Sequence, residues 1–233
     1  MNYTQVIDIL KANENKSGIL KWKQRKTPTE KIESFGIGLT VLRKIAKQIG
    51  KDPELATQLW ESDIYDARII SLLIDDPKQI TIAQAETQVE NLKQGQLAHV
   101  FSACGAPLSK SPHVMDLVLM WRDSKDAIRR SCSYGLIYEL SKSKKKSAPD
   151  NIFFLECVEK INDSFENESN GVQVAMGGAL LGIGKRNAIL NVAALKIANK
   201  IGSIQIESDN RECEPFTVVK HLTSDYIKNK LGV

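Results

Sequence analysis

Five cationic side chains stand where they could contact phosphate oxygens. Lys185 and Arg186 lie in a turn between two helical patterns, and the first backbone N–H groups of the next helix could bind the same phosphate. Arg68 lies off the apolar stripe of its predicted helix, where it can face a partner, and Arg129 and Arg130 fall in the first turns of another predicted helix. Phosphate binding is the chemistry predicted for this set, with a solvated turn as the alternative for Lys185 and Arg186.

Nucleophiles and metal ligands are sparse in the 233-residue chain. It has three histidines, and its four cysteines, without a CxxC pair, are Cys104, Cys132, Cys157 and Cys213. We therefore expect reduced cysteines, a cytoplasmic protein, and no metal or cofactor. His99 is the only histidine on a short, almost wholly apolar segment, where a hydrogen-bonded core residue is the commoner outcome and a catalytic base the rarer one.

Charge is segregated along the chain, although the formal net charge is only +4. It is +8 in residues 11–51, −7 in 52–92, +5 in 121–146, −5 in 147–169 and +4 in 170–200. This alternation suits stacked helices with one basic and one acidic surface, and a basic concave face is typical of proteins that bind a polyanion. Apolar runs are too short for a membrane span, and the first residues lack the pattern of a signal peptide.

Residues 34–76 predict three short helices. The first has an apolar stripe at helical spacing and ends at Gly50, and Asp52 with Pro53 begins the second, which buries Trp60. Ser62 or Asp63 is expected to cap the third. Two short antiparallel helices cannot bury their apolar faces alone, so such hairpins must stack. Further helices are expected over residues 2–12, 82–92, 96–104, 112–121, 125–141 (capped by Asp123 or Ser124), 150–166, 172–183, 188–200 and 216–230.

A weak internal repeat supports stacked hairpins. Trp60, Ser62, Asp66-Ala67 and Arg68 are echoed by Trp121, Ser124, Asp126-Ala127 and Arg129.

A second feature is the pair Gly177 and Gly178 inside a predicted helix, where each costs roughly 1 kcal/mol relative to alanine. We expect the close approach of another backbone to make this pair tolerable.

Two stretches resemble the DNA alkylation repair family, the AlkD-like HEAT-repeat DNA glycosylases. They are Phe35-Gly36-Ile37, Leu42 to Ala46, Leu59 to Ser62 and Ala67-Arg68 in the first, and AMGGALLGIGKRNAIL, residues 175–190, in the second. The resemblance covers most of residues 34–202. It implies an all-α fold, a HEAT-like repeat superhelix (α-α solenoid) of antiparallel helical hairpins. We expect a single domain over residues 1–233, and a monomer.

The activity that the resemblance implies is excision of cationic methylated purines, which needs a carboxylate beside the positively charged sugar. It places that acid near Phe101 and aromatic side chains near Leu97 and at Gly178. The sequence has no aspartate or glutamate between Glu90 and Asp116. We therefore assign no catalytic residue, and only the paired arginines of the family find a match, in residues 129 and 130.

The sequence predicts a DNA-binding protein that recognises duplex DNA of damaged or unusual, including branched, structure through Arg68, Arg129, Arg130, Lys185 and Arg186. Efficient base excision is not expected. Two alternatives stay open. One is an active alkylpurine glycosylase whose carboxylate comes from another helix, as Asp116 or Asp126, or which uses His99. The other is a protein-binding helical scaffold. No role is assigned to the tail, residues 203–233.

Overall fold

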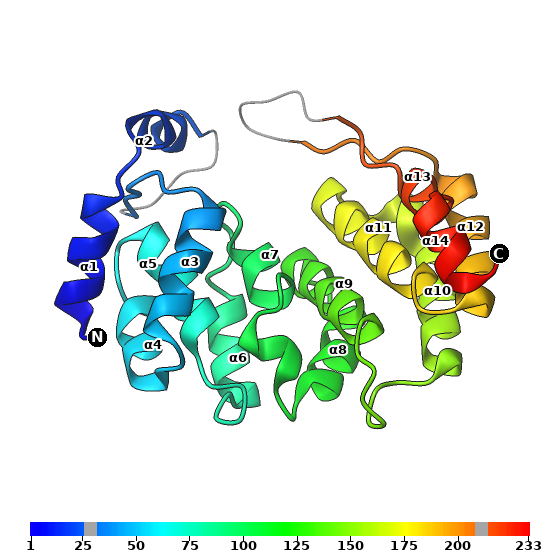
Figure 1. Ribbon diagram of the computed structural model, residues 1–233, viewed down its shortest axis with the longest axis horizontal. Coiled ribbons are helices and arrows are strands. Elements are labelled where there is room, and N and C mark those ends of the chain that lie inside the picture. The colour runs from blue at the N-terminus through cyan, green and yellow to red at the C-terminus, as the bar shows by residue number, and fades with distance from the viewer. Residues whose placement is uncertain (26–31, 208–213) are drawn as a thin grey trace. The chain divides into compact units, whose positions relative to one another are not determined.

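The computed structural model describes residues 1–25, 32–207 and 214–233, and most of them lie in helices (Figure 1). Packing divides the described residues near residue 114 into two compact units, those up to Val114 and those from Met115 onward. The single domain expected over residues 1–233 stays a prediction. In the described part of the chain, no helix is both long enough and apolar enough to cross a membrane.

In the first unit, α5 is the central helix. It packs against α1, α3, α4 and α7, and its first turns bury Tyr65 and Asp66. The helices of this unit are α1 (Tyr3–Ala12), α2 (Lys16–Lys23), α3 (Leu39–Ile49), α4 (Pro53–Trp60), α5 (Tyr65–Ile74), α6 (Ile82–Val89) and α7 (Leu97–Ser102), followed by the 3-10 helix η1 (Pro107–Lys110).

Several predicted helix ends are confirmed in the first unit. Gly50 ends α3 with a φ of 80°, and the carboxylate of Asp52 accepts a hydrogen bond from the Leu55 N–H at the start of α4. The predicted cap of α5 is wrong, because the helix begins after Ile64 and has no side-chain cap. The Ser62 hydroxyl instead accepts from the Ile64 N–H, just before the helix.

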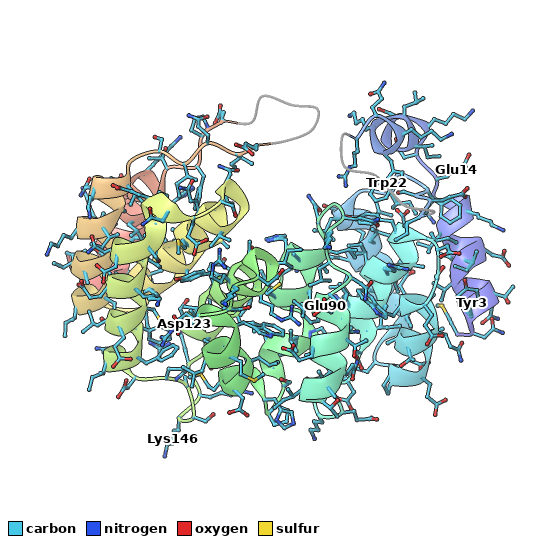
Figure 2. The ribbon with its side chains drawn as sticks, turned by 180° about the vertical axis from the view of Figure 1, so that it is seen from behind. Tyr3, Glu14, Trp22, Glu90, Asp123 and Lys146 are labelled. Atoms are coloured by element: carbon cyan, nitrogen blue, oxygen red, sulfur yellow. The ribbon has the colours of Figure 1, made fainter. Side chains whose placement is uncertain are left out.

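The two tryptophans of this unit are buried to different degrees. Trp22 is buried and lies on α2 (labelled in Figure 2), where its indole N–H donates to the carbonyl of Ile32. Its ring centroid is 4.4 Å from that of Tyr65 on α5. Trp60 is only half-buried, so its predicted place in the core is wrong.

In the second unit, α11 is the central helix and packs against α9, α12 and α13. The helices are α8 (Val114–Arg122), which begins at the boundary, α9 (Ala127–Ser141), α10 (Asn151–Ser164), the 3-10 helix η2 (Phe165–Asn167), α11 (Asn170–Gly184), α12 (Ala188–Ile201), α13 (Val218–Leu222) and α14 (Asp225–Leu231). Asp126 caps α9, where Asp123 or Ser124 was predicted. The single helix predicted over residues 216–230 is two helices, interrupted at Thr223.

The hairpin of α4 and α5 recurs 62 residues later as α8 and α9. The hydroxyl of Ser71 on α5 donates to the carbonyl of Ala56 on α4 at 2.7 Å, and both residues are buried. Ser133 on α9 makes the same contact to Val118 on α8 at 2.9 Å. Each hydroxyl joins the two helices of its hairpin, so the predicted repeat is present as three-dimensional structure.

Four helices share a second contact. The side chain of the fourth residue donates to a carbonyl at the end of, or just after, the preceding helix: Arg68 to Ser62 (2.8 Å), Arg130 to Ser124 (2.7 Å), Gln173 to Phe165 (3.0 Å) and Asn191 to Gly184 (2.9 Å). In this register the equivalent of Arg68 is Arg130, whereas the sequence comparison paired it with Arg129. Each contact ties the first turn of a helix to the segment of chain that precedes it.

The two adjacent glycines of α11 have different surroundings. A Cβ atom at Gly177 would lie 2.5 Å from the Ile204 Cδ1 atom and 2.9 Å from the Phe216 Cε1 atom. At Gly178 the same atom would meet nothing within 4 Å. The backbone approach predicted at this pair is therefore wrong: side chains of the tail cover Gly177, and Gly178 faces open space.

Alanine at these two positions is expected to give opposite results. Gly178→Ala should raise the unfolding free energy by about 1 kcal/mol, because the helix gains propensity without a clash. The unfolding free energy of Gly177→Ala should be about 2 kcal/mol lower than that of Gly178→Ala, because the new methyl group displaces Phe216. Urea unfolding of both variants measures the difference, and equal stabilities would contradict it.

Candidate nucleic-acid interface

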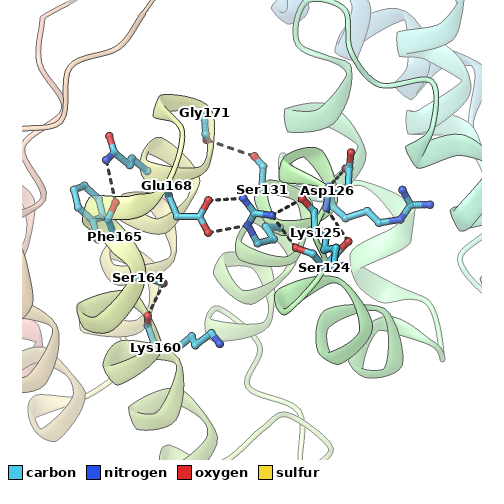
Figure 3. A network of polar contacts seen from close by, with 12 residues as sticks. Ser124, Lys125, Asp126, Ser131, Lys160, Ser164, Phe165, Glu168 and Gly171 are labelled. Atoms are coloured by element: carbon cyan, nitrogen blue, oxygen red, sulfur yellow. Dashed lines mark hydrogen bonds and ion pairs between the residues drawn. The ribbon is translucent and has the colours of Figure 1, made fainter.

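Arg130 is held by the protein on several sides. Its Nε and Nη2 atoms donate to the two carboxylate oxygens of Glu168, each at 2.7 Å, and Nη1 donates to the carbonyls of Ser124 and Lys125. The Glu168 side chain is only 9% exposed, and its carboxylate faces the start of α9 in Figure 3. The hydrogen bonds that Arg130 donates to Glu168 raise the pKa of Arg130. Arg130 thus ties α9 to the segment before α11 and has few donors left for phosphate.

Arg186 is also occupied within the second unit. Its Nη1 atom donates to the carbonyls of Ser141 and Ser143, at 2.9 and 2.7 Å. The guanidinium lies over the ring of Phe154, 5.0 Å from its centroid. These contacts join the turn after α11 to the end of α9 and to α10, which favours a positioning role for this side chain.

Arg68 is half-buried and partly engaged. Its Nε atom donates to the Ser62 carbonyl, and its guanidinium lies 5.6 Å from the ring centroid of Trp60. Burial lowers the pKa of Arg68. The contact to Ser62 uses one of five N–H donors, so this side chain is fixed in direction while most of its donors point elsewhere.

Arg129 and Lys185 are both half-buried in the second unit. The Arg129 N–H donates to the capping carboxylate of Asp126 at 2.8 Å. Lys185 is joined by Lys230 of α14, whose ammonium donates to the Lys185 carbonyl at 2.9 Å. Burial and, second, the charge of Lys230 lower the pKa of Lys185. Two lysines thus meet at the end of α11, an arrangement that an anion would stabilise.

The predicted backbone contribution from α12 is reduced by a cap. The Asn187 side chain accepts from the Leu190 N–H at 3.0 Å, so one of the first N–H groups of α12 is already satisfied. The amide group of Asn187 also donates to Asn151 at 2.9 Å, which links the starts of α12 and α10. The sequence located the helix start correctly, and the structure shows that a side chain occupies part of it.

The position implied for a catalytic acid is apolar and closed. Phe101 on α7 is 2% exposed and Leu97 is fully buried. His99, on the same helix, is exposed, so the prediction of a core histidine is wrong. Its Nε2 atom lies 3.1 Å from the Sγ atom of Cys104, a residue with a φ of 59°. Of the three cysteines expected to be small core residues, Cys132 is buried, Cys104 is only half-buried and Cys213 lies outside the described residues. Cys157 is buried as well.

The two carboxylates considered as substitutes for the missing acid are both exposed. Asp126 caps α9 and accepts from the Arg129 N–H, so it lies one turn from that arginine. Asp116 is on α8. Within the described ranges, no three histidine, cysteine or acidic side chains are grouped as metal ligands would be.

Comparison with known proteins decides the family. The family model described as DNA alkylation repair enzyme matches residues 9–204. The chain belongs to the DNA alkylation repair family. The chain is also similar to two uncharacterised proteins, one of Listeria innocua and one of Listeria monocytogenes. Each is 20% identical over 224 residues, which is 95% of this chain and 96% of theirs.

A solved structure confirms the fold of this family member. It comes from a study of a new family of proteins related to the HEAT-like repeat DNA glycosylases, with affinity for branched DNA structures. It matches 100% of this chain and 97% of its own, with a TM-score of 0.81 and 21% sequence identity. The predicted all-α, HEAT-like repeat fold is therefore confirmed.

Proposed function

We propose that this member of the DNA alkylation repair family binds DNA of damaged or branched structure without efficient base excision. The proposal rests on the residues of α7 and its surroundings. At the position that the resemblance assigns to the catalytic acid, this helix has the buried ring of Phe101, and residues 91–115 contain no carboxylate. Loss of a preorganised electrostatic group of this kind typically costs about 10²–10³ in rate.

Gly178 supports the same proposal. The resemblance implies an aromatic side chain at this position, which would hold a cationic base through its ring face. Among the described residues, nothing lies within 4 Å of where its Cβ atom would be, so none of their side chains replaces the ring there. A protein without the acid and without the ring keeps the means to bind phosphates but lacks those that stabilise a departing base.

Phosphate contacts are expected from Arg68, Arg129 and Lys185, whereas Arg130 and Arg186 position the surrounding backbone. The matching solved structure belongs to proteins with affinity for branched DNA, which favours branched DNA as the preferred form here. Phosphate contacts fix the position of a protein on DNA without reading bases, and deformable or branched DNA is recognised by its shape. We expect the protein to act as a monomer.

The test is binding of purified protein to labelled duplex, alkylated duplex and four-way branched DNA across a salt series, with released base measured in the same samples. We expect affinity to fall steeply with salt, to be highest for branched DNA, and no base to be released. Arg129→Gln and Lys185→Gln should each reduce the slope of log K against log salt by about 1. Lys78→Gln, an exposed lysine beside Asp76, is the matched control.

The second candidate is a glycosylase that uses Asp126, because this exposed carboxylate lies beside Arg129. Base release that persists in Arg129→Gln but disappears in Asp126→Asn would establish it. Asparagine is also a good N-cap residue, so that variant keeps the start of α9 intact. If the wild-type protein fails to bind any DNA at low salt, the DNA proposal is wrong and a protein-binding scaffold takes its place.

A further inference from the structure

Two exposed cationic side chains in the first unit donate hydrogen bonds to the carbonyl groups of consecutive residues. The Nη2 atom of Arg43, on α3, donates to the carbonyl of Cys104 at 3.1 Å. The ammonium of Lys110, at the end of η1, donates to the carbonyl of Gly105 at 2.9 Å. Consecutive Cα atoms are 3.8 Å apart, so the turn after α7 anchors two cations from distant parts of the chain on neighbouring residues.

The described residues do not neutralise this pair. No ion pair within the described ranges includes either cation, and residues 91–115, which hold the turn, contain no aspartate or glutamate. Neutral carbonyl groups orient the two charges without cancelling them. Two adjacent like charges repel each other, and an anion between them removes the repulsion and gains two charge-assisted hydrogen bonds.

The surrounding surface has the same sign. Lys44 and Lys47 are exposed on α3, together with Arg43, and α3 contains no acidic residue. These residues belong to the segment 11–51, the most basic of the chain at +8. None of the five cations predicted from the sequence comes from this segment.

We propose that Arg43 and Lys110 form a phosphate-binding clamp for the nucleic-acid backbone in the first unit. The contact to Cys104 uses one of the five N–H donors of Arg43, and Lys110 uses one of three, so both keep donors for phosphate oxygens. The inference rests on the proposed DNA binding and locates one contact within it. The ligand class is a phosphodiester, which the clamp grips by charge and geometry and not by base identity.

The direct test compares the salt dependence of branched-DNA binding for wild type, Arg43→Gln, Lys110→Gln, the double variant and Lys78→Gln. The double variant should lose about 2 from the slope of log K against log salt and bind about tenfold more weakly, and Lys78→Gln should match wild type. Arg43→Lys, which keeps the charge, should retain most of the slope. Thermal unfolding checks that each variant folds, which is expected because both side chains are exposed.

A second readout separates the clamp from the proposed function. Tripolyphosphate, a phosphate anion without DNA shape, is titrated while the amide signals of Cys104 and Gly105 are followed by NMR. Shifts in wild type that vanish in the double variant support the clamp, even if DNA does not bind. Steep DNA binding by wild type and an unchanged double variant would overturn the clamp and leave the DNA proposal standing. If tripolyphosphate causes no shifts and wild type does not bind DNA, both the clamp and the DNA proposal are wrong.

Discussion

Asp66→Ala is expected to lower the unfolding free energy by about 4 kcal/mol, because it leaves buried hydrogen-bond donors without an acceptor. Asp66 is fully buried in the first turn of α5. One carboxylate oxygen accepts from the Ser34 hydroxyl and the Phe35 N–H, both at 2.8 Å, and the other accepts from the Ile37 N–H at 3.0 Å. The carboxylate therefore holds the whole segment that leads into α3.

The segment held by Asp66 depends on glycine contacts as well. Gly36 has a φ of 69°, and a Cβ atom there would lie 2.6 Å from the carbonyl oxygen of Asn15. The backbone before α2 therefore approaches this segment closely. Loss of Asp66 should release both parts, so we expect the variant to show faster hydrogen exchange at Phe35 and Ile37 as well as lower global stability.

The pH dependence of this effect has a defined sign. Burial raises the pKa of Asp66 above its ordinary value of 3.8, although four hydrogen bonds, from Ser34 and from the backbone of Phe35, Ile37 and Asp66 itself, oppose the shift. The folded protein therefore holds this proton more tightly than the unfolded chain does. Its contribution to stability is greatest below 3.8 and decreases as pH rises towards the folded-state pKa.

Urea unfolding measures both effects. The difference between wild type and Asp66→Ala should be wider at about pH 4 than at about pH 7. Asp63→Ala removes an exposed carboxylate three residues earlier and serves as the control, with a change below about 0.5 kcal/mol. A loss of less than about 1 kcal/mol in Asp66→Ala would contradict the assigned role.

The second large effect is expected at Arg130. Arg130→Gln should lower the unfolding free energy by about 3 kcal/mol, because it leaves the nearly buried carboxylate of Glu168 without its cation and frees the Ser124 and Lys125 carbonyls. Glu168→Gln should also destabilise, by a smaller amount, since its amide oxygen can still accept one hydrogen bond from the guanidinium.

Arg129→Gln is the matched control for this experiment. It removes the same charge from the neighbouring position of α9 and should change stability by less than about 1 kcal/mol while weakening DNA binding. Arg130→Gln should lower stability strongly but weaken DNA binding only slightly, when binding is measured well below its unfolding temperature. Equal stability of the two variants would show that the pair with Glu168 contributes little.

Local structure could be predicted from local sequence. The spacing of Leu42, Ile45 and Ala46 predicted the buried face of α3, and Asp52 was correctly expected at the start of α4. Such signals act within a few residues, because helical periodicity and capping depend on neighbours one turn away. For the same reason the repeat of α4–α5 in α8–α9 was visible, although Arg68 was paired with Arg129 in place of Arg130.

Tertiary structure decided which partners the individual side chains contact. The sequence by itself determined an all-α repeat protein of the DNA alkylation repair family without an acid in residues 91–115. It could not show that Arg130 binds Glu168, 38 residues away, or that Arg186 binds Ser141, 45 residues away. It also could not show that Arg43 and Lys110 meet at one turn. Partners so distant in sequence come together only through packing, which composition and periodicity do not encode.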